Sequence, residues 1–127
     1  MSWDGMVSDN LVGTGQVSKG AICGLDGSIW ARSPNFNLDP AEAAAAAKGF
    51  NDPGSLFAGG LRFEGEKYLV LQADPTRIMG KKASDGCFCF KTNSRSFVLG
   101  IYEGGLRPEG CSKVCGDLAD YLSSTGY

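Results

Sequence analysis

The chain has 127 residues, of which 43% are hydrophobic and 20% are charged, and its formal net charge is −2. This length fits a single domain over residues 1–127, and the composition excludes a disordered chain. The small net charge provides no general attraction to nucleic acid, so we expect no nucleic-acid partner and only local basic surfaces.

The cysteines and the apolar runs indicate the compartment. The five cysteines are irregularly spaced, and no N-x-[ST] glycosylation acceptor is present. This pattern is atypical of a secreted disulfide scaffold, so we expect reduced thiols. No apolar run approaches the roughly 20 residues that span a bilayer, and the N-terminus lacks a signal-peptide pattern. The sequence therefore predicts a soluble, intracellular protein.

The first two elements are predicted to be a helix and a β-hairpin. Ser2 can cap a helix whose apolar residues recur at helical spacing from Trp3, and the glycines of segment 13–15 end it. In segment 19–33, two β-prone runs flank Asp26-Gly27, a dipeptide typical of tight hairpin turns.

The clearest predicted helix runs from Pro40 to Gly49. Asp39 stands at the N-cap position, Pro40 takes the first helical position, and Glu42 completes a capping box. The alanine run that follows favours close packing against a flat surface.

The segment from Gly60 to Tyr102 changes to β-prone runs separated by turn signals. The predicted strands are 61–65, 67–74, 77–80, 86–92 and 96–102. The predicted turns are 64–66, 74–75 and 85–86. Short connections of this kind favour an antiparallel meander.

A long C-terminal helix is predicted after Pro108, because apolar or small residues recur at helical spacing. These residues are Cys111, Val114, Cys115, Leu118, Ala119 and Leu122. The order helix, hairpin, helix, meander and helix predicts an α+β domain with one antiparallel sheet and helices on its faces.

Two motifs that could indicate nucleotide binding are incomplete. The GKK sequence at 80–82 fails as a P-loop, which needs a glycine at Pro75 and a hydroxyl residue at Lys82. The GTGQVS sequence at 13–18 lacks the third glycine of a dinucleotide fingerprint. The chain has no histidine, so a serine or cysteine nucleophile has no conventional base. We expect no enzymatic activity and no cofactor.

The cysteines leave one alternative open. Cys87 and Cys89 lie on one face of a predicted strand, and Cys111 and Cys115 lie on one face of a predicted helix, so four thiolates could bind zinc. We favour the interpretation that these cysteines are small apolar core residues, as Cys23 is, and we expect no metal.

Basic residues gather between Thr76 and Tyr102, where Asp85 is the only acidic residue. They are Arg77, Lys81, Lys82, Lys91 and Arg95. They form either a solvated rim of strand ends or a site for an anionic partner, such as an acidic protein face or phosphorylated lipid headgroups.

Aromatic residues occur near both ends of the chain and in the hairpin. They are Trp3, Trp30, Tyr121 and Tyr127. Taken alone, Trp3 would be a core anchor. If the terminal helices pack side by side, however, the rings could gather into a surface that suits polyproline, whose rings stack on aromatics and whose carbonyls accept hydrogen bonds.

The sequence resembles the profilin family over nearly the whole chain, and particularly the plant and amoeboid branch. The resemblance is carried by SWDGMVSDNL, AICGLDGSIWA, GKKASDGCFCFKT, GIYEGGLRPEGC and LADYL. It implies the family's fold, a single antiparallel sheet with the N- and C-terminal helices packed on one face and shorter helices on the other.

The resemblance also implies a cytoplasmic, cytoskeleton-associated protein, expected to be a monomer. Such a protein binds monomeric actin, promotes its nucleotide exchange, regulates its polymerisation and docks on proline-rich segments. By position, the polyproline site would comprise Trp3, Met6, Trp30, Tyr121, Leu122 and Tyr127. Met6 replaces a tyrosine of many profilins, which removes one ring and one hydroxyl, although methionine can still pack against proline.

The actin-binding residues implied by position are Lys91, Arg95, Arg107, Ser112, Lys113 and Asp117. Arg77, Lys81 and Lys82 match the family's basic loop, which is associated with phosphoinositide headgroups. The alternative function is a sensor or trafficking adaptor module of the same fold without actin binding. Polyproline binding would require that Trp3 and Trp30 be adjacent and partly exposed.

Overall fold

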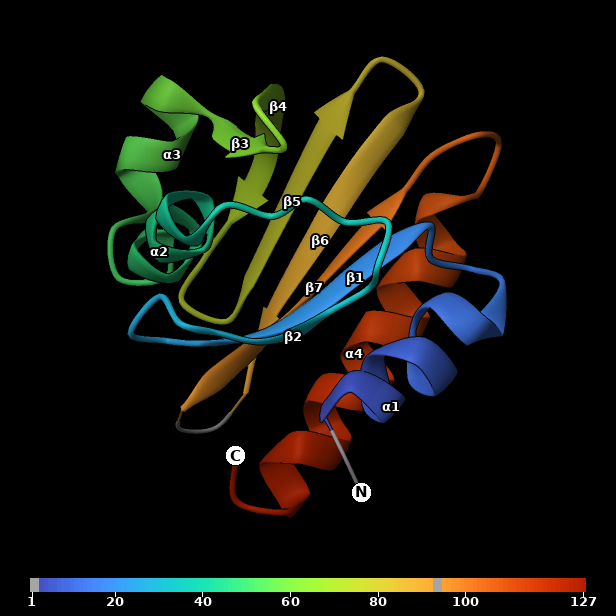
Figure 1. Ribbon diagram of the computed structural model, residues 1–127. Coiled ribbons are helices and arrows are strands. Elements are labelled where there is room, and N and C mark those ends of the chain that lie inside the picture. Colours follow the sequence, from blue (N-terminus) through green and yellow to red (C-terminus); the bar gives the residue numbers. More distant parts are fainter. Residues whose placement is uncertain (1–2, 93–94) are drawn as a thin grey trace.

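The computed structural model describes residues 3–92 and 95–127, and within them seven antiparallel strands form a single sheet with helices on both faces (Figure 1). The helices are α1 (Trp3–Asn10), the 3-10 helix η1 (Val12–Thr14), α2 (Pro40–Gly49), α3 (Pro53–Gly59) and α4 (Pro108–Ser124). The strands are β1 (Lys19–Gly24), β2 (Ile29–Arg32), β3 (Leu61–Phe63), β4 (Glu66–Ala73), β5 (Arg77–Lys82), β6 (Asp85–Lys91) and β7 (Ser96–Tyr102). None of the described helices is long and apolar enough to cross a bilayer.

The strand order across the sheet is β2-β1-β7-β6-β5-β4-β3. The strands from β3 to β7 form an antiparallel meander, and the β1–β2 hairpin joins it because β1 pairs with β7. The turn of this hairpin contains Asp26 and Gly27, and Gly27 has a φ of 92°, which glycine adopts without strain. The predicted α+β class, meander and hairpin are therefore confirmed.

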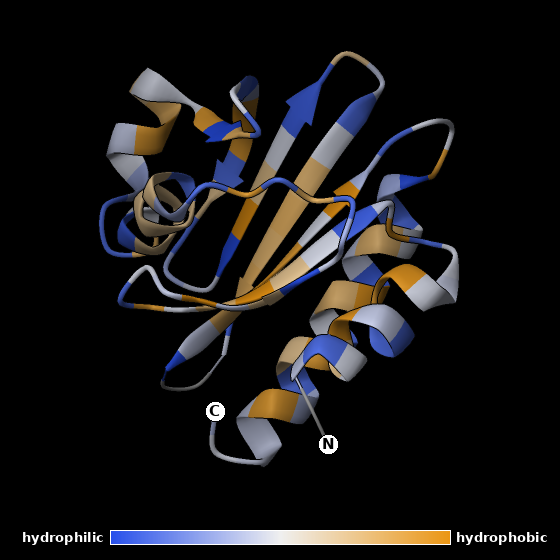
Figure 2. Cartoon of the chain, in the orientation of Figure 1, coloured by the Kyte–Doolittle hydropathy of each residue, from blue (hydrophilic) through white to orange (hydrophobic). Residues whose placement is uncertain are grey.

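Two hydrophobic cores lie on opposite faces of the sheet. Helices α2 and α3, with Phe36 and Leu38 of the segment before α2, cover one face, which we call the α2 face. Helices α1 and α4 pack on β2, β1, β7 and β6 on the other, the α4 face. Successive residues of β7 alternate between these cores, as Val98 and Leu99 do. Figure 2 shows apolar residues along the central strands, between the two helix layers. The predicted placement of the helices is confirmed.

The terminal helices pack on the sheet through apolar residues whose helical spacing in the sequence predicted these helices. Met6 and Val7 of α1 are buried, and Leu11 after it is fully buried. The buried residues of α4 are Cys111, Cys115, Leu118, Ala119 and Leu122. Ser2, which was expected to cap α1, lies outside the described residues.

Two glycines allow the terminal helices to approach the sheet closely. Gly20 of β1 and Gly100 of β7 are partners in the ladder. A Cβ atom at Gly100 would overlap the Sγ atom of Cys115 and lie 3.3 Å from the Sγ atom of Cys111. A Cβ atom at Gly20 would lie 2.8 Å from a methyl carbon of Leu11. The close packing of α4 on β7 therefore depends on the missing side chain at Gly100.

The predicted turn at residues 85–86 is wrong. The strands β5 and β6 are joined by a two-residue turn at 83–84, and Asp85 already pairs with Lys82. Ala83 takes the positive φ of 54° that this turn requires, which its residue type does not indicate. Gly86 is needed for another reason, because a Cβ atom there would overlap the phenol of Tyr102.

The residue pattern predicts no element between α2 and β3, whereas the structure has the short helix α3 there. Pro53 occupies its first turn, but the preceding Asp52 makes no side-chain capping hydrogen bond. Only Leu56 of this helix is buried, so it lacks a repeated apolar period. The family resemblance, which implies more than one shorter helix on this face, is the better guide here.

A carboxylate network ties β1, α2 and the β3–β4 turn together. Glu64 accepts hydrogen bonds from Nζ of Lys19 at 2.5 Å and from the N–H of Asn37 at 2.9 Å. Glu42 completes the predicted capping box of α2 and also accepts hydrogen bonds from the N–H groups of Glu64 and Gly65, both at 2.8 Å. Burial by itself would raise the pKa of Glu64, but the hydrogen bonds from Lys19 and Asn37 lower that pKa overall.

We expect Glu64→Gln to lower the free energy of unfolding by about 1–2 kcal/mol at pH 7, because Lys19 loses the nearer of its two carboxylate partners and keeps only Glu103 at 3.6 Å. The pKa of Glu64 is lower in the folded than in the unfolded state. Its stabilisation is therefore present above the unfolded pKa of about 4.3 and is lost as the pH falls through the folded pKa. Urea unfolding of wild type and variant at pH 7 and at about pH 3 measures the difference, which should shrink at the lower pH.

The matched control for this prediction is Glu66→Gln. Glu66 forms an ion pair with Lys82 at 3.3 Å, but its side chain is 62% exposed. Its replacement should cost less than about 0.5 kcal/mol at either pH. An equal cost for the two variants, or a cost of Glu64→Gln that does not change with pH, would contradict the assignment of the network.

Candidate functional site

Three aromatic rings from distant parts of the chain meet beside the N-terminal end of α1. The ring centroid of Trp3 lies 4.9 Å from that of Trp30 in β2 and 4.9 Å from that of Tyr127 after α4. The centroids of Trp30 and Tyr127 are 6.2 Å apart. All three side chains are partly buried and partly exposed. We call Trp3, Trp30 and Tyr127 the aromatic cluster.

The orientation of Trp30 is fixed by its neighbours in the β1–β2 turn. Its indole Nε1 donates a hydrogen bond to Oγ of Ser28 at 3.1 Å, and that hydroxyl donates to Asp26 at 2.6 Å. The hydrogen bonds from Ser28 lower the pKa of Asp26, which therefore remains an acceptor at neutral pH. The indole consequently presents one fixed face at the surface.

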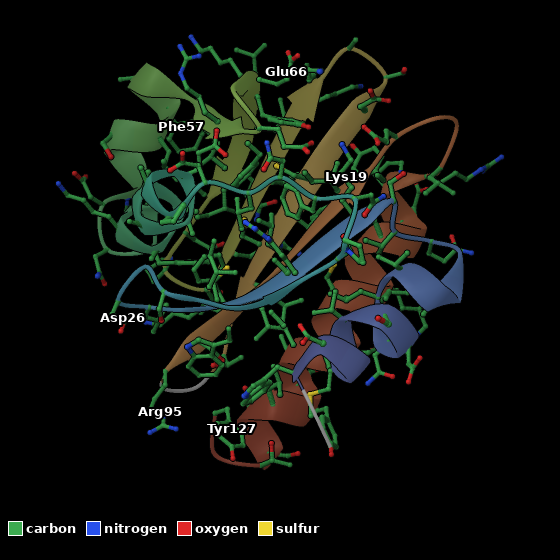
Figure 3. The ribbon with its side chains drawn as sticks, in the orientation of Figure 1. Lys19, Asp26, Phe57, Glu66, Arg95 and Tyr127 are labelled. Carbon is green, nitrogen blue, oxygen red and sulfur yellow. The ribbon has the colours of Figure 1, made fainter. Side chains whose placement is uncertain are left out.

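Tyr127 is held in place by the β6–β7 connection. The hydroxyls of Thr92 and Ser96 each donate to its main-chain oxygen at 2.8 Å, and the N–H of Arg95 donates to the same oxygen at 3.1 Å. The N–H of Tyr127 donates to the carbonyl of Leu122 at 2.9 Å. The guanidinium of Arg95 lies 5.6 Å from the centroid of the Tyr127 ring (Figure 3). This ring is therefore fixed although it follows the end of the last helix.

The other residues predicted for the polyproline site occupy different environments. Leu122 is fully buried and Met6 is 8% exposed, and the aromatic cluster packs against the core that contains both. Tyr121 is 44% exposed and lines a shallow hollow with Asp9 and Asp117, between α1 and α4. Met6 and Leu122 thus support the rings from below, whereas Tyr121 lies on the surface in a hollow that none of the three rings lines.

A second candidate surface lies where the α4 face of the sheet has no helix over it. On this face α4 packs mainly on β7 and β6, and α1 packs on β1 and β2, so β4 and β5 remain uncovered. The ladder places four side chains on this side. Arg77, Met79 and Lys81 pair with Phe90, Phe88 and Gly86, and Leu69 pairs with Lys81, so all four lie on the same side of the sheet as Phe88. Arg62 and Lys67 belong to the same side of β3 and β4. We call this surface the open sheet face.

The open sheet face combines apolar exposure with positive charge. Leu69 is 65% exposed, and Leu71, at an irregularity in the β4–β5 register, is 54% exposed. At its border with α4, a shallow hollow is lined by residues of β5, β6 and the first turns of the helix. They are Arg77, Met79, Phe88, Pro108, Glu109 and Ser112. Exposed leucines beside cations are typical of a surface that receives a partner.

The residues predicted to bind actin do not form one cluster. Arg107 precedes α4 and Ser112 lines the hollow at the open sheet face. Lys113 forms an exposed ion pair with Asp117 at 3.1 Å, and Asp117 lies in the hollow beside α1. Lys91 is the last residue of β6, and Arg95 lies on the ring of Tyr127, near the other end of α4.

The three residues predicted to bind phosphoinositides are divided between the two faces of the sheet. Arg77 and Lys81 belong to the open sheet face, whereas Lys82 belongs to the α2 face. The Nζ atom of Lys82 lies 3.3 Å from the Glu66 carboxylate and 5.8 Å from the ring centroid of Tyr68. The sequence prediction did not include Arg62 and Lys67, which lie on the same side of the sheet as Arg77 and Lys81. The alternation of side chains along β3 and β4 could have indicated this placement.

The two cysteine pairs lie on opposite faces of the sheet. Cys87 and Cys89 belong to the core under α2, and Cys111 and Cys115 belong to the core under α4. The proposed meeting of four thiolates is therefore wrong, and the described ranges 3–92 and 95–127 contain no group of three or more metal-ligating side chains. Burial raises the pKa of Cys23 to about 12, which is typical of an unreactive core thiol.

Comparison with known proteins agrees with the fold and with the sequence resemblance. The profilin family model matches residues 1–127. Profilin-3 of Caenorhabditis elegans is 50% identical over 127 residues, which cover all of both chains. The structure of Acanthamoeba castellanii profilin IA has a TM-score of 0.94 at 41% identity and covers 99% of this chain and 100% of its own.

A more distant solved structure shows the same fold. It is mouse profilin IIa in complex with a double repeat from the FH1 domain of mDia1, with a TM-score of 0.79, 20% identity and full coverage of both chains. The match of the family model over the whole length, together with the identity to curated profilins, shows that this chain belongs to the profilin family.

Proposed function

We propose that the protein binds monomeric actin through the open sheet face and proline-rich segments through the aromatic cluster. In this way it regulates actin polymerisation and nucleotide exchange. Membership of the profilin family supports this function, and the mouse relative was solved with a repeat from an FH1 domain. The two surfaces lie on different parts of the molecule, so one molecule can hold both partners.

The observation that carries the polyproline proposal is the adjacency of Trp3, Trp30 and Tyr127, with centroids 4.9 to 6.2 Å apart. Proline rings stack flat on aromatic faces, and the polyproline II helix is already extended, so little entropy is lost on binding. Both tryptophans are partly exposed. Polyproline binding requires this exposure, whereas the alternative function of a sensor or trafficking adaptor module does not. A proline decamer should therefore change the tryptophan fluorescence, and an unchanged spectrum at millimolar peptide would refute the site.

The actin proposal is supported by the exposed leucines of the open sheet face and by its cations, which form no ion pair with any residue that the structure describes. Leu69 offers apolar contact area, and Arg77 and Lys81 offer charge to an acidic protein surface. Ser112 and Arg107, at the start of α4, adjoin this face and belong to the proposed actin surface. Arg95 is left out of it, because it lies with Tyr127.

Two adjacent lysines provide a test of the actin surface. We expect Lys81→Glu to weaken binding of monomeric actin by about tenfold or more, because it reverses a charge at the centre of the proposed contact. Lys82→Glu makes the same change one residue later but on the opposite face of the sheet, so it should alter the affinity less than about twofold. The rate of nucleotide exchange on monomeric actin, measured against protein concentration, gives both affinities. Equal effects would refute the placement.

We further propose that phosphoinositide headgroups bind the open sheet face. Arg77 and Lys81 would make the contact with Arg62 and Lys67, and clustered cations of this kind attract multivalent anions at a membrane surface. Lys82 is excluded, because it pairs with Glu66 on the other face. We also infer a cytoplasmic, monomeric, non-enzymatic protein, in keeping with the family.

A further inference from the structure

Arg95 lies at the edge of the aromatic cluster with its main chain fixed on both sides. Its N–H donates to the oxygen of Tyr127 at 3.1 Å, and its carbonyl accepts from the N–H of Leu25 at 2.9 Å. The side chain is exposed, and its guanidinium lies 5.6 Å from the Tyr127 ring centroid. Figure 3 shows both residues at the same end of the molecule. Arg95 is thus a positioned cation and belongs to the surface of the cluster.

The charge of Arg95 has no carboxylate partner within residues 3–92 and 95–127, where the ion pairs involve only lysines. Stacking on an aromatic ring orients a guanidinium but leaves its N–H groups free to donate at the ring edge. A carboxylate from a ligand could accept two of these hydrogen bonds at once.

The geometry of a polyproline II helix brings a flanking residue to this cation. Such a helix rises about 3.1 Å per residue, so the first and second residues beyond a proline stacked on Tyr127 lie about 3 and 6 Å farther along. This is the same range as the 5.6 Å between the guanidinium and the ring centroid. Hydrogen bonds from Thr92 and Ser96 to the main-chain oxygen of Tyr127 fix the backbone that carries this ring.

We propose that Arg95 is a specificity residue of the polyproline site and that it selects proline-rich segments with an Asp or Glu directly beside the prolines. This inference rests on the proposed function of the aromatic cluster. In this role Arg95 does not belong to the actin surface. It gives the polyproline site a preference for negatively charged peptides, which stacking on the rings alone would not provide.

The test compares end-blocked proline octamers that carry a single Glu or Gln on either side of the prolines. Fluorescence titration at low salt should show that the wild type binds at least one Glu peptide about three- to fivefold more tightly than its Gln counterpart. In Arg95→Gln this ratio should fall to about one, whatever the change in absolute affinity. Lys48→Gln, which removes an exposed cation at the end of α2, should keep the wild-type ratio.

Salt provides a second readout that needs no variant. The Glu-to-Gln ratio of the wild type should approach one at about 0.5 M salt, because an exposed ion pair is screened. Equal binding of Glu and Gln peptides by the wild type at low salt, or an unchanged ratio in Arg95→Gln, would overturn the role of Arg95 and leave the polyproline site standing. Failure of the wild type to bind any of the peptides would overturn both.

Discussion

Replacing Trp3 by alanine should weaken binding of a proline decamer by at least about 30-fold. Trp3 is the central ring of the aromatic cluster, since its centroid lies 4.9 Å from those of both Trp30 and Tyr127. Its removal takes away one stacking surface and the ring that the other two contact most closely. A central, partly desolvated tryptophan is the type of residue that dominates interface energy. Anisotropy of a labelled decamer measures the affinity.

The control for Trp3→Ala is Phe57→Ala, which also removes a partly exposed aromatic ring. Phe57 lies on α3, on the other side of the sheet and far from Tyr127 (Figure 3). This variant should bind the decamer as the wild type does. Trp3→Ala should keep its effect on nucleotide exchange by actin, because the open sheet face does not include α1. A normal decamer affinity for Trp3→Ala would rule out the aromatic cluster as the binding surface.

Replacing Gly100 by alanine should lower the free energy of unfolding by about 2–3 kcal/mol. The new Cβ atom would overlap the Sγ atom of Cys115, a fully buried residue of α4. A packed core can relieve such an overlap only by moving the helix or adopting a poor rotamer. Urea unfolding monitored by far-UV circular dichroism measures the loss.

Two further variants separate this overlap from a general effect of alanine. Cys115→Ala removes the Sγ atom, so the double variant Gly100→Ala/Cys115→Ala should recover part of the stability lost by Gly100→Ala, as a double-mutant cycle reveals. Gly116→Ala on the same helix meets only ring atoms of Phe90 at 4.0 Å and should be stabilising by about 0.5–1 kcal/mol. Additive effects in the cycle would show that Gly100 and Cys115 do not compete for space.

Local sequence signals were sufficient for most of the fold. The capping box formed by Asp39 and Glu42 and the apolar period after Pro108 each depend on contacts within a few residues, and they predict α2 and α4. The turn at 83–84 could not be predicted, because Ala83 adopts a positive φ that is imposed by the paired strands. The glycine at position 86 suggested a turn, but a glycine is needed there because the phenol of Tyr102 packs against it.

The candidate site was predictable in part. Trp3, Trp30 and Tyr127 meet as the packing of the terminal helices implied. Adjacent residues on a strand must point to opposite faces, so the separation of Lys81 from Lys82 follows once β5 is known to extend to residue 82. The contact between Arg95 and Tyr127 joins positions far apart in the sequence, and no local pattern indicates it.

The lengths of the two outermost strands bear on how the protein associates with itself. An open sheet presents unpaired backbone groups at its edges, and a long, flat edge can template another chain. Here the edges are β3, with three residues, and β2, with four. Glu42 occupies the N–H groups at the turn after β3, and Arg62 and Lys67 place two positive charges on that hairpin. Short and charged edges of this kind oppose the stacking of two molecules of this protein through their sheets.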